Sequence, residues 1–163
     1  MKENSIIIVG AGIGGLTTAL YLHEKGFKVE VYESAREIKP LGVGINLLPH
    51  AVRVLTNLGI QPHLQDVAVA TKELVYYNKF GKRIWQEPRG KFAGYNWPQF
   101  SIHRGTFQMQ LLQVAKELLG EAHIHTGHCL QSFSQNENKV KATFIDKETG
   151  ILKAAAEADM LIG

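Results

Sequence analysis

The segment SIIIVGAGIGG, residues 5–15, decides the fold expected for this chain. Its apolar run is typical of a strand buried on both faces, and a glycine-rich turn follows at once. Residues 16–25 then place apolar side chains at helical spacing, and Gly26 is expected to end that helix in a left-handed conformation. Residues 29–33 alternate as a second strand that ends on an acid, Glu33. This order predicts the strand–helix–strand unit that binds dinucleotides.

The glycines of the turn have different expected roles. Gly10 allows the tight turn, Gly12 lets the backbone approach a pyrophosphate, and Gly15 lets helix and strand pack closely. Unpaired N–H groups and the positive end of the helix dipole would then face the phosphates. The alternative is that GxGxxG is only a glycine turn. The strand, helix and acid around it favour the nucleotide interpretation.

The acid at the end of the second strand indicates which nucleotide is bound. Glu33 follows Gly15 by 18 positions, near the spacing of about 20 expected for a residue that accepts a hydrogen bond from a ribose 2′-hydroxyl. A carboxylate there would repel a 2′-phosphate. The tightly held ligand is therefore expected to be FAD or NAD, and not NADP.

The composition of the whole chain excludes several classes of protein. With 163 residues, 45% hydrophobic and 20% charged, it is typical of one soluble globular domain. A net charge of +3 without a basic motif argues against nucleic acid as a partner. No apolar stretch is long enough for an integral membrane segment. The single cysteine, Cys129, favours a reducing compartment and a cytoplasmic location. Residues 158–163 read as a buried strand, so we expect the chain to be cut there.

Downstream of the nucleotide unit the pattern changes. Residues 41–49 form an apolar loop with two glycines, which indicates either backbone lying against a flat ligand or a plain strand-to-helix connection. Residues 74–77 and 82–86 predict an antiparallel hairpin. An NAD domain would continue to alternate strands and helices here, so the hairpin favours an FAD protein with a separate substrate-binding sheet. Residues 130–157 predict a small antiparallel meander.

Several side chains could carry chemistry. Ordinary sheet packing is favoured over an aromatic substrate box for Trp85, Tyr95, Trp97 and Phe100. Arg104, at the start of a long helix, is either an exposed arginine or a fork that reaches cofactor oxygens. Apart from Cys129, no acid or cysteine is placed at a spacing that would complete a zinc site with His123, His125 and His128, so no metal is expected.

These features together give a family resemblance. The chain resembles the N-terminal portion of the class A flavoprotein monooxygenases, which are FAD-dependent aromatic hydroxylases related to p-hydroxybenzoate hydroxylase. The matching segments run from end to end of the chain: residues 10–16, 32–33, 42–49, 55–59, 103–104 and 158–163. Within this family the chain is similar to the phenazine hydroxylases, notably at residues 40–49, 87–90 and 101–105.

The resemblance implies a set of cofactor-binding residues. It places FAD on Gly10, Gly12, Gly14, Gly15, Glu33, Gly42, Val43, Gly44, Arg104 and Leu130. The first four would bind the pyrophosphate and Glu33 the adenosine ribose. Residues 42–44 would lie beside the isoalloxazine, Arg104 near the ribityl-phosphate part, and the backbone of Leu130 beside the adenine. No side chain stands out as a catalytic acid or base.

The resemblance also implies a fold and a division into domains. The fold would be α/β, a Rossmann-like FAD-binding βαβ domain of the glutathione-reductase type, truncated, with an inserted antiparallel β-hairpin and a small β-meander. Residues 1–67 would form the first part of the FAD-binding domain. Residues 68–100 would contribute to the sheet of the substrate domain, and residues 101–163 would continue the FAD-binding domain until it is cut short.

The implied activity is that of the complete enzyme. It would use FAD, with NAD(P)H as a transient reductant and O₂, to hydroxylate a small electron-rich aromatic substrate. The 163-residue chain alone is expected to be inactive and to bind FAD weakly. Two alternatives stay open. One is another FAD oxidoreductase of the same plan, a halogenase or reductase. The other is a truncated, non-catalytic nucleotide-binding module.

Overall fold

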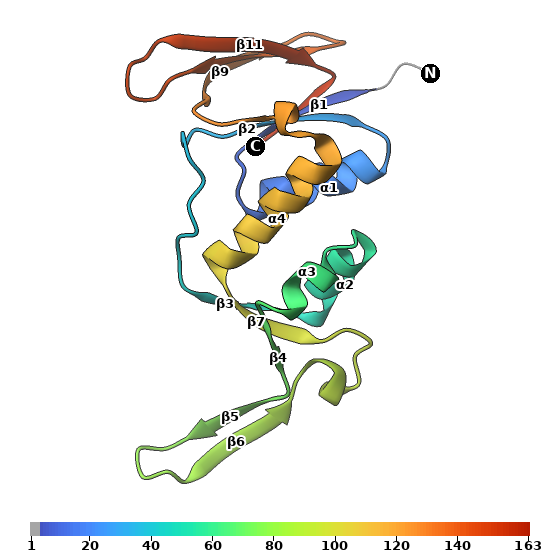
Figure 1. Ribbon diagram of the computed structural model, residues 1–163, viewed down its shortest axis with the longest axis vertical. Helices are drawn as coiled ribbons and strands as arrows, with labels where there is room; N and C mark the ends of the chain where they lie inside the picture. The colour runs from blue at the N-terminus through green and yellow to red at the C-terminus, as the bar shows by residue number, and fades with distance from the viewer. Residues whose placement is uncertain (1–3) are drawn as a thin grey trace. The chain divides into compact units, whose positions relative to one another are not determined.

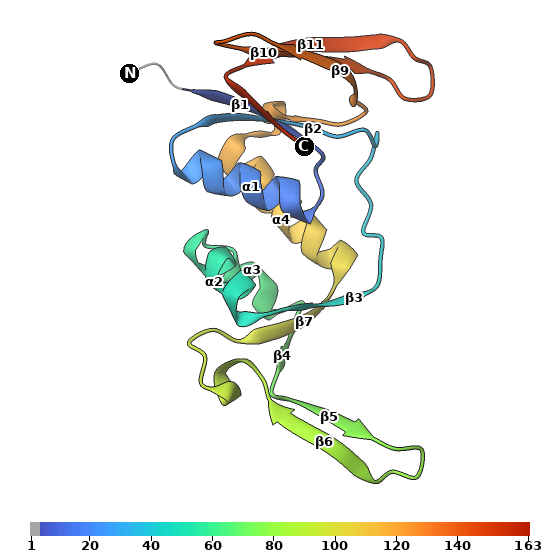
Figure 2. The same cartoon turned by 180° about the vertical axis from the view of Figure 1, so that it is seen from behind.

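The computed structural model describes residues 4–163, which divide into two compact units (Figures 1 and 2). The first unit comprises the described residues up to Lys39 together with Gln108–Gly163, and the second is Pro40–Phe107. No helix in this part of the chain is long and apolar enough to cross a membrane.

A parallel sheet forms the centre of the first unit. Its strands, in the order β12-β1-β2-β8, are Met160–Ile162, Ser5–Val9, Lys28–Tyr32 and Ile124–His125. Helix α1, Ile13–Glu24, connects β1 to β2. The expected strand–helix–strand unit is therefore confirmed. Ile7 and Ile8 are each 1% exposed although they point to opposite faces, as predicted for a strand with both faces covered.

An antiparallel meander covers one face of the parallel sheet. It consists of β9 (Cys129–Gln135), β10 (Val140–Ile145) and β11 (Leu152–Ala158), as the sequence predicted. In both views it lies on the opposite side of β1 and β2 from α1 and from residues 108–119 of α4 (Arg104–Leu119) (Figures 1 and 2). The Tyr32 ring is stacked between Phe144 and His125, at centroid distances of 4.0 and 4.4 Å. This stack fixes the meander on the parallel sheet.

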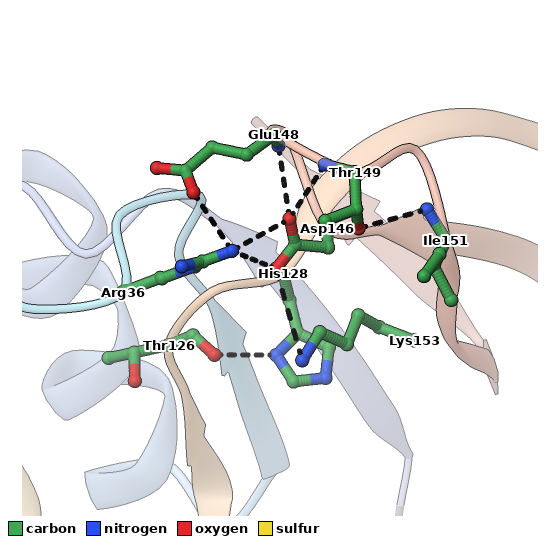
Figure 3. Close-up of polar contacts among 8 residues, drawn as sticks. All are labelled: Arg36, Thr126, His128, Asp146, Glu148, Thr149, Ile151 and Lys153. Atoms are coloured by element: carbon green, nitrogen blue, oxygen red, sulfur yellow. Dashed lines mark hydrogen bonds and ion pairs between the residues drawn. The ribbon is translucent and has the colours of Figure 1, made fainter.

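An ion-pair cluster joins the loop after β2 to the β10–β11 turn (Figure 3). One guanidinium nitrogen of Arg36 donates to both carboxylate oxygens of Asp146, at 3.1 and 3.0 Å. Asp146 Oδ1 also accepts the backbone N–H groups of Glu148 and Thr149, each at 3.0 Å. The Thr149 N–H and the Arg36 guanidinium lower the pKa of Asp146 to about 2, although burial opposes this shift. The carboxylate organises the turn and anchors Arg36.

Replacing this carboxylate should give a pH-dependent loss of stability. The folded-state pKa of Asp146 lies below its ordinary value of 3.8. Its stabilising contribution is therefore complete above that value and is lost as the pH falls toward about 2. We expect Asp146→Asn to lower the thermal unfolding midpoint at pH 7, and the difference from wild type to narrow below pH ~4. Glu148→Gln, at an exposed partner of Arg36, should change the midpoint little. A difference that stays constant down to pH ~2.5 would contradict this account.

A second, antiparallel sheet organises the other unit. Its strands, in the order β3-β7-β4, are Gly44–Leu47, Gln99–His103 and Val69–Thr71. Helices α2 (Pro49–Asn57) and α3 (Gln61–Gln65) follow β3. Pro49 occupies the first turn of α2, and Gly59, at φ +71°, follows the end of the helix. The sequence did not indicate α3, which is only one turn long. Fully buried Ile60 and Leu64 stabilise it through packing.

The predicted hairpin is present as β5 (Glu73–Tyr77) and β6 (Arg83–Pro88), followed by the 3₁₀ helix η1 (Gly90–Ala93). The packing interpretation is confirmed for Phe100, which is 4% exposed. It is wrong for Trp85 and Tyr95, which are 54% and 59% exposed. Within Pro40–Phe107 no further strand pairs with this hairpin, and several of its large side chains, Trp85 among them, are exposed.

Candidate functional site

The glycine turn between β1 and α1 has the geometry that the sequence predicted. Gly10 has φ +103°, and its N–H donates to the Tyr32 carbonyl at 2.7 Å. A Cβ atom on Gly15 would lie 1.9 Å from the Gly10 carbonyl oxygen, so only glycine allows this approach of helix to strand. A Cβ atom on Gly12 or Gly14 would meet nothing within 4 Å. The backbone beside these two glycines is open.

The N-terminus of α1 provides donors without side-chain acceptors. Gly12 is the N-cap residue and makes no side-chain capping bond, and the first turn holds no acid. The first intrahelical bond runs from the Leu16 N–H to the Gly12 carbonyl, at 2.9 Å. The N–H groups of the first turn of α1 and the positive end of the helix dipole therefore favour an anionic ligand.

Glu33 lies against this turn. One carboxylate oxygen accepts the Ala11 N–H at 2.8 Å, and the other accepts the Ala35 N–H at 2.8 Å and the Ser34 hydroxyl at 3.1 Å. Burial raises the pKa of Glu33, but these hydrogen bonds outweigh it and hold the pKa below its ordinary value. The carboxylate is thus ionised at neutral pH, half-buried, and adjacent to the glycine turn.

Backbone hydrogen bonds to Glu33 hold the segment that leads into the meander beside the glycine turn. The Glu33 N–H donates to the His125 carbonyl, and the His128 N–H donates to the Glu33 carbonyl, both at 2.8 Å. Leu130 follows in β9, partly buried against the core cluster and paired with Phe144. The β9–β10 register shifts between Thr143 and Phe144, which marks a β-bulge beside Leu130. Bulges are common where a strand is shaped for a ligand.

One residue at this site was missed by the sequence reasoning. The carboxamide of Gln108, in α4, donates to the Ala11 carbonyl at 2.9 Å. Gln108 therefore binds the carbonyl of the same residue whose N–H binds Glu33. The sequence held no signal that sets Gln108 apart, because Thr106 and Gln110 beside it are also polar.

The second unit brings together the remaining predicted residues. The Arg104 N–H donates to the Val43 carbonyl at 2.9 Å, and Gly44 pairs with His103 between β3 and β7. Gly42 has φ +127°, and a Cβ atom on it would lie 3.3 Å from Cβ and Cδ of Arg104. The exposed loop and the arginine at the start of α4 thus form one local surface. Val43 is 74% exposed on it.

Two of the three histidines considered for a metal, His123 and His125, contact an acid, whereas the ring of His128 contacts the Thr126 carbonyl. The Glu30 carboxylate, in β2, lies 2.9 Å from His123 Nδ1 and 2.8 Å from His125 Nε2. Burial raises the pKa of Glu30. The hydrogen bonds with His125 and His123 outweigh this effect, so the pKa lies below its ordinary value. Strand pairing places Glu30 here, which sequence spacing could not reveal. Among residues 4–163 no group of three or more His, Cys, Asp or Glu side chains is arranged to hold a metal ion.

Comparison with known proteins identifies the class to which this fold and site belong. Residues 3–163 match the family described as "FAD binding domain", and the chain belongs to that family. Its cofactor is FAD.

Individual relatives are hydroxylases or monooxygenases by name. The chain is 43% identical to the phenazine 1,6-dicarboxylic acid hydroxylase PhzS of Lysobacter antibioticus, over 99% of this chain and 40% of that protein. It is 31% identical to 6-hydroxynicotinate 3-monooxygenase of Pseudomonas fluorescens, over 97% of this chain and 39% of that protein. The crystal structure of p-nitrophenol 4-monooxygenase PnpA from Pseudomonas putida DLL-E4 has the same fold, with a TM-score of 0.84 at 20% identity, over 98% of this chain and 40% of that one. The chain therefore spans about 40% of the length of these proteins.

Proposed function

We propose that the full-length protein containing this chain is an FAD-dependent monooxygenase that hydroxylates a small aromatic compound with NAD(P)H and O₂. The observation that carries the proposal is the open glycine turn at the start of α1, with the ionised Glu33 carboxylate beside it. Family membership and the activities for which the relatives are named support the proposal. Bound FAD would supply the oxidation chemistry, and the protein would hold and orient the cofactor.

The local geometry supports an assignment of cofactor contacts, whose individual roles are those that the family resemblance implies. In the first unit, Gly10, Gly12, Gly14 and Gly15 shape a backbone that a pyrophosphate can approach, because no side chain occupies it. We assign the adenosine ribose to Glu33 and the adenine to the backbone of Leu130. In the second unit, we assign the isoalloxazine to Gly42, Val43 and Gly44, and the ribityl-phosphate part to Arg104. The residues present therefore fit FAD.

We also propose the finer features of the fold and location. The chain would follow the glutathione-reductase plan, with residues 1–67 and 101–163 in the FAD-binding domain. Residues 68–100 would be an insertion that adds its hairpin to a substrate-domain sheet. The 163-residue chain alone would lack turnover and bind FAD weakly, because it holds about 40% of the length of its relatives. The single cysteine supports a cytoplasmic location.

The test is turnover by the purified full-length protein. We expect a yellow protein with bound FAD whose NAD(P)H oxidation is stimulated by aromatic acids, with a product one oxygen atom heavier by mass spectrometry. Aromatic acids are the first choice because two relatives are named for substrates with carboxyl groups. A halide-dependent chlorinated product would identify a halogenase, and NAD(P)H oxidation without oxygen insertion a reductase. A protein that binds no flavin and turns over no NAD(P)H would favour the alternative of a non-catalytic nucleotide-binding module.

A further inference from the structure

The second unit contains a cavity that the proposed FAD contacts do not explain. Its volume is about 580 Å³, within the range of about 300–1,000 Å³ typical of small-molecule sites. Its walls come from the start of α2, the end of β6, η1 and the first residue of β7. None of the residues assigned to FAD lines it.

The cavity has an excess of positive charge. Two guanidinium groups, those of Arg53 and Arg89, line it together with one carboxylate, that of Glu87. Glu87 pairs with a terminal nitrogen of Arg89, and the buried Nε of Arg89 has no acceptor among residues 4–163. None of the ion pairs formed in this part of the chain involves Arg53. The excess charge favours an anionic ligand, and guanidinium groups bind carboxylates well.

A buried amide adds a neutral polar group to the same wall. Gln99 is only 6% exposed, yet it lines the cavity, and no side-chain hydrogen bond within the described residues satisfies its carboxamide. Its position is fixed by close backbone contact. Gly90 has φ +54°, and a Cβ atom on it would lie 2.4 Å from the backbone nitrogen of Gln99. The polar atoms of its carboxamide are not sealed from solvent, so they are available to a ligand in the cavity.

Aromatic rings supply the remaining surface. The Arg53 guanidinium lies over the Trp97 ring, 5.8 Å from its centroid. Tyr95 also lines the cavity and keeps 59% of its surface exposed. Large flat side chains beside guanidinium groups favour a ligand that has both a planar ring and a negative charge.

We propose that this cavity binds a planar aromatic carboxylate, with its ring against Trp97 and Tyr95 and its carboxylate directed to Arg53 and Arg89. The amide of Gln99 would complete the polar contacts. The inference rests on the proposed function in one respect: it gives the carboxylate of an aromatic substrate a place within residues 40–107.

The experiment compares two probes that share one ring system and differ by one charge. Phenazine-1-carboxylate and phenazine are titrated against the full-length protein by equilibrium dialysis. We expect Arg53→Gln and Arg89→Gln each to weaken binding of the carboxylate by about tenfold or more, as for loss of a charged hydrogen bond. Binding of neutral phenazine should change less than about threefold. Trp97→Leu should weaken both probes alike, because it removes ring contact and not charge.

The matched control is Arg83→Gln, which removes the same charge from the exposed hairpin outside the cavity. It should bind both probes as wild type does. The proposal is overturned if Arg53→Gln and Arg89→Gln bind the carboxylate normally, if both probes weaken equally in them, or if Arg83→Gln weakens the carboxylate as much. Thermal midpoints verify that each variant is folded. Dialysis needs no turnover, so failure of the monooxygenase proposal and failure of this one are seen separately.

Discussion

Gly15→Ala will destabilise the protein and deprive it of FAD. The added Cβ atom would lie 1.9 Å from the Gly10 carbonyl oxygen, so the helix must move away from the strand. Gly10 has little freedom to yield, because its own N–H is bonded to Tyr32. Overpacking of this kind costs about 1–3 kcal/mol or more. The loss is measured by urea unfolding, and the cofactor by the flavin-to-protein absorbance ratio.

The same substitution at the preceding position is the control. A Cβ atom on Gly14 would meet nothing within 4 Å, and alanine favours a helix by about 1 kcal/mol over glycine. Gly14→Ala should therefore keep or raise the free energy of unfolding. If the open space beside Gly14 is where a pyrophosphate lies, this variant will nevertheless bind FAD less tightly. If both variants lost the same free energy of unfolding, the close contact between Gly15 and the Gly10 carbonyl would not be the cause of the loss in Gly15→Ala.

Glu33→Ala is expected to raise the dissociation constant for FAD by about tenfold or more, measured by flavin fluorescence. The substitution leaves the N–H groups of Ala11 and Ala35 without their acceptor and removes the carboxylate proposed to bind the ribose. Glu33→Gln keeps the shape and one acceptor oxygen, so its effect should be intermediate. Glu37→Ala, an exposed acid in the same loop, should bind FAD within about twofold of wild type.

The pH dependence gives an independent check on Glu33. Its pKa in the folded protein lies below the ordinary value of 4.5. The carboxylate therefore contributes fully to stability above that value, and its contribution is lost as the pH falls through the folded-state pKa. The stability difference between wild type and Glu33→Gln should be constant from pH 6 to 8 and shrink under acid conditions. If the stability difference instead shrank as the pH rose, the ionised carboxylate of Glu33 would not be the stabilising form.

The sequence was most informative where structure depends on neighbours along the chain. The turn at Gly10, the close packing at Gly15 and the position of Glu33 all follow from one segment whose steric requirements few other residues can meet. The three-stranded meander followed from strand patterning and turn residues for the same reason. Such features are local, so a single sequence is enough to predict them.

Contacts between distant residues were not predictable in this way. Gln108 reaches Ala11, and Arg36 reaches Asp146, because tertiary packing brings their elements together. Neither pair has a spacing that distinguishes it from ordinary surface residues. Glu30 was overlooked for the same reason, since only the pairing of β2 with β8 places it beside His125. The exposure of Trp85 depends on which layers surround the hairpin, and its own segment holds no information about that.

The position of β1 in its sheet has a consequence for the order of folding. This strand is synthesised well before Met160–Ile162, the strand with which one of its edges pairs. Until the ribosome has released those residues, β1 can complete its ladder only with β2. The nascent chain must therefore keep one edge of a very apolar strand from pairing with other molecules while about 150 residues emerge. Slow, non-local closure of this kind predicts dependence on chaperones during synthesis.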